Sequence, residues 1–367
     1  MLDLQATYRL SRYVFMHVVD CELVLESAIS NIQFKIGNNA ILTLLLALTR
    51  PFRPSDLLAG RSTNEQATVE AFLKMCDVHG LLSAVGVDGL AEEEVNHFSH
   101  WEFHDLLFHT RSRFGKTLVS VGATMRFLDS FPPEPCQKEP GTFAELISLS
   151  HPDLERKRAN DVSFTSVLES RRSRYGLGAL TADQLGEFLY RTCRITGESE
   201  APLPLDKFLK KVYPSGGSLH SLEIYVAISA CTEIDQGLYY YSGATHVLGL
   251  IRKFDPDVAQ IFERAKQSVG GLPSDPPVVF VLSARFRRTA WKYQSIAYRA
   301  LLMEVGGLYQ TMYLVATAMG LAPCAIGCGD SAHFAALIGS DYYMETSVGE
   351  FILGGRNPEV EKPGMHK

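Results

Sequence analysis

A proline-rich stretch limits how this chain can fold. Four prolines lie between residues 131 and 141, namely Pro132, Pro133, Pro135 and Pro140. Proline fixes its φ angle and carries no backbone N–H, so the stretch can form neither a helix nor a central strand. We therefore expect a linker here. Because 367 residues exceed the length of an average domain, two domains are expected around it.

The predicted domains cover residues 1–140 and 155–367. In the first, residues 39–48 and 62–78 have helical periodicity, and Gly80 is a helix stop. Their order is similar to a winged-helix arrangement, so we expect a mostly helical domain that either recognises a peptide or only docks or dimerises. A role in nucleic-acid binding is not favoured, because the net charge is −6 and the second helix carries one lysine against two glutamates.

Composition and spacing restrict the setting and the chemistry. The seven cysteines are scattered and odd in number, and the N-terminus has no charged-then-apolar leader, which predicts a cytoplasmic protein with reduced thiols. The longest apolar run, residues 40–48, is too short to span a membrane. His104 and His109 lack a third ligand, and Cys324 and Cys328 are better suited to core packing, so no metal site is expected.

Two short motifs carry the strongest functional signal. Residues 171–174 read Arg-Arg-Ser-Arg, a group of guanidiniums and a hydroxyl that suits a phosphate or an electron-rich ring. Residues 214–217 read Pro-Ser-Gly-Gly, a turn of small residues that lets backbone amides approach a flat ligand. Between them, Thr181 and Gln184 form a capping box that predicts a helix.

The elements after the second motif can also be predicted. Residues 222–228 alternate as a strand, and residues 237–248 indicate a hairpin. The apolar run 277–282 predicts a strand buried on both faces. A long helix is expected from Glu304 to Gly320, and a strand is expected to end the domain at residues 351–356.

Together these motifs resemble the nitroreductase superfamily, and most closely its branch of SagB-type azoline dehydrogenases. The resemblance covers about residues 161–356 and implies an α+β fold with a mixed central sheet flanked by helices, and a homodimer with FMN in its interface. It also implies a set of FMN-binding residues: Arg171, Arg172, Ser173, Arg174, Pro214, Ser215, Gly216, Gly217, Gln310, Gly327 and Arg356.

Lys292 and Tyr293 are the expected catalytic residues. The resemblance assigns a Lys-Tyr pair at this position the role of base, and aromatising an azoline requires a proton to leave the ring. A lysine with a lowered pKa can accept that proton. The alternative is a solvent-exposed lysine beside an inward-packed tyrosine.

The expected function is FMN-dependent oxidation of peptide thiazolines or oxazolines to thiazoles or oxazoles. A cyclodehydratase or a carrier-bound assembly line would supply the azoline peptide. Two alternatives stay open: an NAD(P)H-dependent reductase of nitro or quinone compounds, and a catalytically silent peptide-binding scaffold of the same fold.

Overall fold

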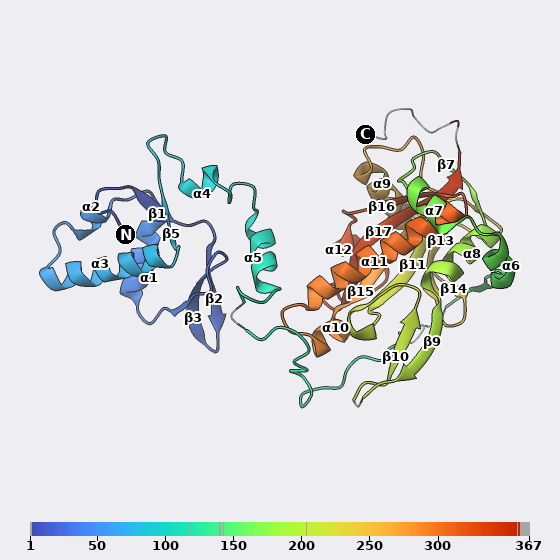
Figure 1. Cartoon of the computed structure of the whole chain (residues 1–367), viewed down its shortest axis with the longest axis horizontal. Coiled ribbons are helices and arrows are strands. Elements are labelled where there is room, and N and C mark those ends of the chain that lie inside the picture. Colours follow the sequence, from blue (N-terminus) through green and yellow to red (C-terminus); the bar gives the residue numbers. More distant parts are fainter. Residues whose placement is uncertain are drawn as a thin grey trace. The chain divides into compact units, whose positions relative to one another are not determined.

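The chain forms two compact units, residues 1–122 and 123–367, and each is described by itself (Figure 1). The computed structural model describes residues 2–117, 119–138, 141, 143–202, 204–357 and 359. Two residues of the predicted linker, Glu139 and Pro140, lie outside the described residues. Within these ranges no helix is both long enough and apolar enough to cross a membrane.

The first unit combines helices with short antiparallel strands. Its helices are α1 (Asn39–Leu48), α2 (Pro54–Leu58), α3 (Thr63–Val78), α4 (Glu92–Val95) and α5 (Phe103–Arg111). Its strands are β1 (Tyr8–Leu10), β2 (Val14–Val19), β3 (Glu22–Ser27), β4 (Gln33–Lys35) and β5 (Leu82–Ala84). The order β2-β3-β4 makes one small sheet, and β1 pairs with β5.

Local signals explain where the helices of this unit begin and end. The Asn38 side chain accepts the N–H of Ile41 and so begins α1. Ser62 and Glu65 form a capping box at the start of α3. Gly80 follows α3 at φ +67°, a conformation that glycine adopts without strain. The two helices predicted at residues 39–48 and 62–78 are therefore confirmed.

The second unit is built around one large sheet. Its helices are α6 (Leu154–Asn160), α7 (Phe164–Ser170), α8 (Ala182–Cys193), α9 (Pro256–Ser268), α10 (Phe286–Lys292), α11 (Ala297–Ala318), α12 (Ser331–Leu337) and the short 3₁₀ turn η1 (Gly216–Ser218). Its strands are β6 (Leu146–Ser148), β7 (Leu177–Gly178), β8 (Leu180–Thr181), β9 (Ile195–Glu200), β10 (Lys207–Lys211), β11 (Leu222–Ile228), β12 (Cys231–Thr232), β13 (Gly237–Ser242), β14 (Val247–Lys253), β15 (Val278–Arg285), β16 (Ala322–Ile326) and β17 (Glu345–Arg356).

The strands of the large sheet run in the order β16-β17-β15-β11-β13-β14-β6, and β7 pairs with the end of β17. The α+β class is confirmed. The sheet differs from the expected mixed one, because the pairs described within it are antiparallel. A hairpin can join neighbours such as β13 and β14 directly, whereas a parallel pair would need a crossover connection.

Helices cover both faces of this sheet. In β11, Ile224 and Val226 belong to the core beneath α8 and α11, whereas Tyr225 and Ala227 belong to the core beneath α9 and α12. Successive side chains of a strand point to opposite faces, so a strand buried on both sides is apolar throughout. The same alternation holds for β15, as its apolar run predicted.

Helix α11 begins earlier than predicted. It starts at Ala297 rather than at Glu304, directly after Ser295 at φ +63° and Ile296. The seven residues before Glu304 therefore continue the same helix, and Glu304 lies in its interior with 3% of its surface exposed.

The proline-rich stretch lies beyond the division between the units, which falls at Gly122. Its main-chain oxygens accept hydrogen bonds from α10. Arg288 donates to the Glu134 oxygen at 2.6 Å, and Trp291 donates to the Phe131 oxygen at 2.8 Å. Proline removes donors but leaves every carbonyl available, so the stretch packs against the second unit instead of linking the two.

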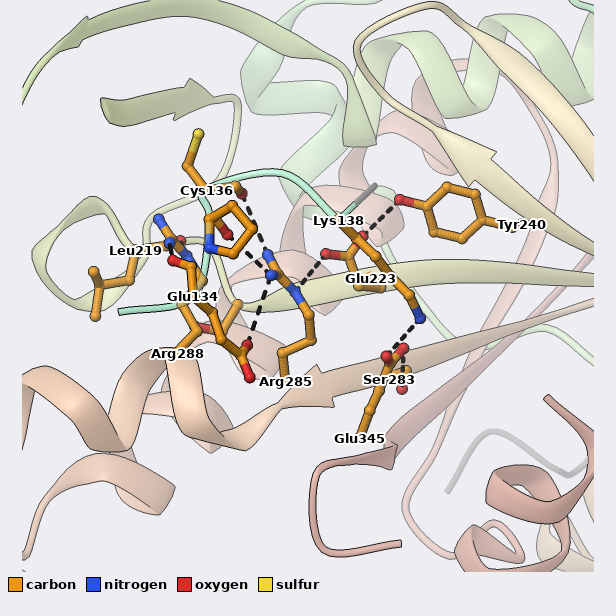
Figure 2. A network of polar contacts seen from close by, with 12 residues as sticks. Glu134, Cys136, Lys138, Leu219, Glu223, Tyr240, Ser283, Arg285, Arg288 and Glu345 are labelled. Carbon is orange, nitrogen blue, oxygen red and sulfur yellow. Dashed lines mark hydrogen bonds and ion pairs between the residues drawn. The ribbon is translucent and has the colours of Figure 1, made fainter. Parts of the chain in front are cut away.

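A polar network continues these contacts across the sheet (Figure 2). Arg285 pairs with Glu223 at 2.8 Å, and Tyr240 donates to the same carboxylate at 2.9 Å. Lys138 pairs with Glu345 at 2.5 Å. Because buried charges are stable only when they are paired, this network fixes residues 134–138 beside β11 and β15.

Replacing Arg288 should loosen this segment. Arg288→Ala leaves the oxygens of Glu134 and Leu219 without their donor, and we expect a loss of about 3 kcal/mol in the free energy of unfolding. Urea unfolding can be followed by the fluorescence of Trp291. Because the chain has a second tryptophan, Trp101, the measurement uses a Trp101→Phe background. The control Arg264→Ala removes a half-exposed ion pair with Asp330 and should change the free energy by less than about 0.5 kcal/mol. Equal effects of the two variants would contradict this role of Arg288.

Candidate functional site

The Pro-Ser-Gly-Gly turn rests directly on helix α11. A Cβ built on Gly307 would lie 3.1 Å from the Cγ of Pro214, so the turn approaches the helix where that side chain is missing. The backbone then passes through left-handed conformations, with φ of +61° at Gly217, +56° at Ser218 and +46° at His220. Such a run is costly for residues other than glycine, and contacts with the rest of the fold must hold it.

The predicted catalytic pair lies against this turn. A Cβ on Gly217 would lie 2.7 Å from Lys292 Nζ, and closer still to Tyr293 Oη. Both residues follow the buried Trp291 at the end of α10. The main-chain oxygen of Lys292 accepts the N–H of Met125 at 3.2 Å. The structure thus brings Gly217 against Lys292 and Tyr293, although this pair lies about 75 positions later in the sequence.

Partial burial changes the acidity of both groups. Desolvation lowers the pKa of Lys292 and raises the pKa of Tyr293. The Lys292 ammonium lies 5.5 Å from the centre of the Phe208 ring, an apolar neighbour that contributes no counter-charge. The Lys292 ammonium therefore loses its proton more readily than an exposed lysine, and the Tyr293 hydroxyl loses its proton less readily than an exposed tyrosine.

The arginine motif lies at a different turn of α11. The Arg171 guanidinium stands 5.3 Å above the Tyr313 ring, and the hydroxyls of Ser173 and Tyr313 share a hydrogen bond of 2.7 Å. The N–H of Arg174 donates to the Pro323 oxygen at 2.9 Å. These contacts gather residues 171–174 where α11 meets the start of β16.

The predicted phosphate contact at the end of the chain joins this group. Arg356 pairs with Leu177 in the β7–β17 ladder, and the N–H of Asn357 donates to the Gly176 oxygen at 3.0 Å. Arg356 therefore ends β17 beside the strand that follows the arginine motif. Arg172 is exposed, with its Nε 3.5 Å from the Ser170 oxygen.

Two separate groups of candidate residues thus lie along α11. Gly307 and Tyr313, which contact the two groups, are six residues apart, or about 9 Å along a helix axis. Gln310 lies between them and is exposed. Gly327 follows the other end of β16, and a Cβ there would meet no heavy atom within 4 Å, so a side chain would project into open space.

Sequence reasoning missed the groups beneath the turn. Ser215 Oγ donates to Glu304 Oε2 at 2.8 Å and accepts the N–H of His220 at 2.9 Å. Both Glu304 and His220 are buried. The available signal was a carboxyl on the apolar face of a helix, between Leu301 and Leu308.

Two family models match separate parts of the chain. Residues 8–118 match the model described as cyanobactin oxidase ThcOx. Residues 169–354, just over half of the chain, match the model of the nitroreductase family.

Individual relatives match about half of the chain or more. The protein MJ1384 of Methanocaldococcus jannaschii, whose name places it among the nitroreductases, is 29% identical over 50% of this chain and 85% of its own length. The microcin B17-processing protein McbC of Escherichia coli is 32% identical over 49% of this chain and 70% of its own length. Among solved structures, the E. coli microcin synthetase McbBCD complex with truncated pro-MccB17 bound gives 20% identity and a TM-score of 0.40, over 68% of this chain and 91% of that one.

A methyl group at Gly217 should disturb the pair beside it. Gly217→Ala and Gly270→Ala both force alanine to a positive φ, but a Cβ at Gly270 would meet no heavy atom within 4 Å. We expect Gly217→Ala to lower the free energy of unfolding by about 1–3 kcal/mol more than Gly270→Ala does. Gly217→Ala should also let an amine-reactive acylating reagent modify Lys292 faster, and mass spectrometry measures the extent of this modification. Equal stability losses and unchanged Lys292 labelling would mean that the turn does not contact the pair.

Proposed function

Because the chain belongs to the nitroreductase family, we propose that it is an FMN-dependent oxidase that converts peptide thiazolines or oxazolines into thiazoles or oxazoles. The observation that carries the proposal is the contact of Gly217 with Lys292 and Tyr293. It puts a base and a hydroxyl beside a turn that a flat ring can approach closely.

The residues present fit FMN. Arg171 lies over the Tyr313 ring of α11, Arg172 follows it in the chain, and Arg356 ends β17 beside β7. These guanidiniums would hold a phosphate by paired hydrogen bonds. Around the turn, Ser215 and Gly217 would contact the ring system. The same proposal assigns cofactor contacts to Ser173, Arg174, Pro214, Gly216, Gln310 and Gly327.

The chain's own residues would handle the proton. Aromatising an azoline removes two hydrogens from the ring, one as a proton and one as a hydride, and FMN, when bound, would supply the acceptor for the hydride and its two electrons. Lys292 accepts the proton that leaves a ring carbon, because burial lowers the pKa of its amine and favours the neutral form. Tyr293 stays protonated, since burial raises its pKa, and its hydroxyl can donate a hydrogen bond at the same place.

The substrate we propose is a peptide. Support comes from the ThcOx model over residues 8–118 and from a relative named for processing microcin B17. We assign peptide recognition or docking to the N-terminal unit, residues 1–122, and FMN binding to the second unit, residues 123–367. These limits replace 1–140 and 155–367, which the proline-rich stretch predicted. The partner would be a cyclodehydratase or an assembly line that forms the azolines, and the setting would be the cytoplasm.

We also propose that the protein acts as a homodimer. Helix α11 presents an exposed stripe at Met303, Gly306 and Gln310, positions one turn apart. Met303 is 68% exposed. A second copy packed on this stripe would bury its apolar surface.

A second candidate is reduction of nitro or quinone compounds with NAD(P)H, supported by the name of the M. jannaschii relative. The visible spectrum of the purified protein, with identification of any released cofactor, is the first test. Bound FMN supports both flavoenzyme functions, and turnover of azoline peptide without NAD(P)H then favours the first. A colourless protein that does not take up added FMN would refute both and favour the silent scaffold.

Removing the amine should stop turnover while FMN stays bound. We expect Lys292→Met to lower the rate on azoline peptide by about 10²–10⁴-fold, and Tyr293→Phe to lower it less. The control Lys210→Met, on the exposed face of β10, should keep the wild-type rate. The wild-type rate should rise with pH as Lys292 loses its proton, with a midpoint below the ordinary value of 10.5 because burial lowers this pKa. Unchanged rates in both variants would contradict the assigned roles.

A charge on the exposed stripe of α11 should separate the dimer. Met303→Glu puts a carboxylate in the proposed interface, and we expect the dissociation constant to rise at least about 100-fold. Analytical ultracentrifugation measures this. Leu146→Glu is the matched control, since Leu146 is 65% exposed on the edge strand β6 and should leave the dimer intact. A dimer that survives Met303→Glu would exclude this face as the interface.

A further inference from the structure

Glu304 is a carboxyl in an apolar place. It lies on the face of α11 that packs against the sheet, between Leu301 and Leu308, and is 3% exposed. Burying a carboxyl costs free energy unless hydrogen bonds compensate. Ser215 Oγ donates a hydrogen bond to Glu304 Oε2 at 2.8 Å, and the backbone N–H groups of Ser221 and Leu222 also act on this carboxyl. The bond from Ser215 joins Glu304 to the Pro-Ser-Gly-Gly turn.

Ser215 connects Glu304 to both ends of that turn. Its hydroxyl oxygen also accepts the N–H of His220, at 2.9 Å. Gly217 and Ser218, both left-handed, lie between Ser215 and His220, and His220 is left-handed as well. A strained backbone of this kind persists only where contacts with the rest of the fold stabilise it. The hydrogen bond from Ser215 to Glu304 of α11 is one such contact.

The geometry points to Glu304 as a positioning residue for Lys292 and Tyr293. Glu304 holds Ser215, Ser215 holds the turn, and Gly217 in the turn lies against Lys292 Nζ and Tyr293 Oη. This inference rests on the proposed function only in calling the pair catalytic. The contacts themselves belong to the chain without any ligand.

The charged and titratable groups around Glu304 come from several elements. His220 Nδ1 lies 3.8 Å from Glu304 Oε1, and neither atom has a hydrogen-bond partner among the described residues. Lys211 faces both groups from the end of β10, Arg288 faces His220 from α10, and the buried Tyr213 lies near the carboxyl.

These surroundings bring the pKa of the Glu304 carboxyl close to neutral pH. Burial raises the pKa of Glu304 to about 7, although Ser215, Lys211 and the backbone N–H groups of Ser221 and Leu222 act in the opposite direction. Burial, with the charges of Lys211 and Arg288, lowers the pKa of His220 to about 3. At pH 7 His220 is therefore neutral, and the Glu304 carboxyl is close to its midpoint of titration.

The test uses the protein without flavin and follows Lys292 itself. Lysines are dimethylated with ¹³C-formaldehyde, and the Lys292 signal, assigned with Lys292→Arg, is titrated by NMR. Glu304→Leu and Ser215→Ala each break the bond to the turn, and each should raise the Lys292 pKa toward 10.5 by the same amount. Their combination should raise it no further, because both act through one bond. Glu304→Gln keeps an acceptor for Ser215 and should restore the wild-type value.

Glu350→Gln is the matched control. Glu350 is also buried with a raised pKa, but it lies among residues of α9 and α12 and should leave the Lys292 titration unchanged. If Glu304→Leu does not fold, Ser215→Ala and Glu304→Gln still decide. An unchanged Lys292 pKa in Ser215→Ala, or additive shifts in the double variant, would overturn the inference.

The pH dependence of the free energy of unfolding tests the titration of Glu304 independently. Its folded pKa of about 7 lies above the ordinary value of 4.5, so its contribution to stability is full below pH 4.5 and is lost as the pH rises through about 7. The difference in stability between wild type and Glu304→Gln should therefore fall across this range, and a constant difference would contradict a titrating Glu304. Neither measurement needs flavin or substrate, so an absence of turnover in the wild type would refute the proposed function and leave this inference standing.

Discussion

Helix α11 is the constraint on which both groups of candidate site residues depend. Its apolar face packs on the large sheet through Leu308 and Met312, and this packing determines where every other contact with the helix falls. The Pro214 ring packs against α11 at Gly307, and Ser173 and Arg171 of the arginine motif contact Tyr313. Figure 1 shows the helix lying along the sheet in the second unit. A shift of α11 would move both groups at once, because each of them contacts this helix.

Much of this architecture could be read from the sequence. The alternation in residues 222–228 and the apolar run at 277–282 each predicted a strand, and both form the centre of the sheet as β11 and β15. The capping box of Thr181 and Gln184 located the start of α8, and helical periodicity located α3 to within a residue. Such signals are local, and local physics decides them.

The errors arose where a distant part of the chain decides the outcome. Four prolines predicted a linker because proline excludes helix and sheet, but no sequence pattern shows that buried arginines of β15 and α10 bind the carbonyls of that stretch. Glu304 was expected at a helix start, but it lies in the interior of α11 and is buried. Its burial depends on a hydroxyl 89 positions away in the chain. The joining of Gly217 to Lys292 follows from the fold in the same way, although each residue was named in advance.

The contacts of the proline-rich stretch have a consequence for how its sequence can vary. Arg285, Arg288 and Trp291 all bind main-chain oxygens there, and every amino acid supplies the same oxygen. Apart from Lys138, whose ammonium pairs with Glu345, side chains could therefore be exchanged in that stretch without loss of these main-chain hydrogen bonds, provided that the path of the backbone is kept. Selection would act on chain length and direction more than on residue identity. A segment of this kind can diverge rapidly between relatives and still be indispensable to the fold.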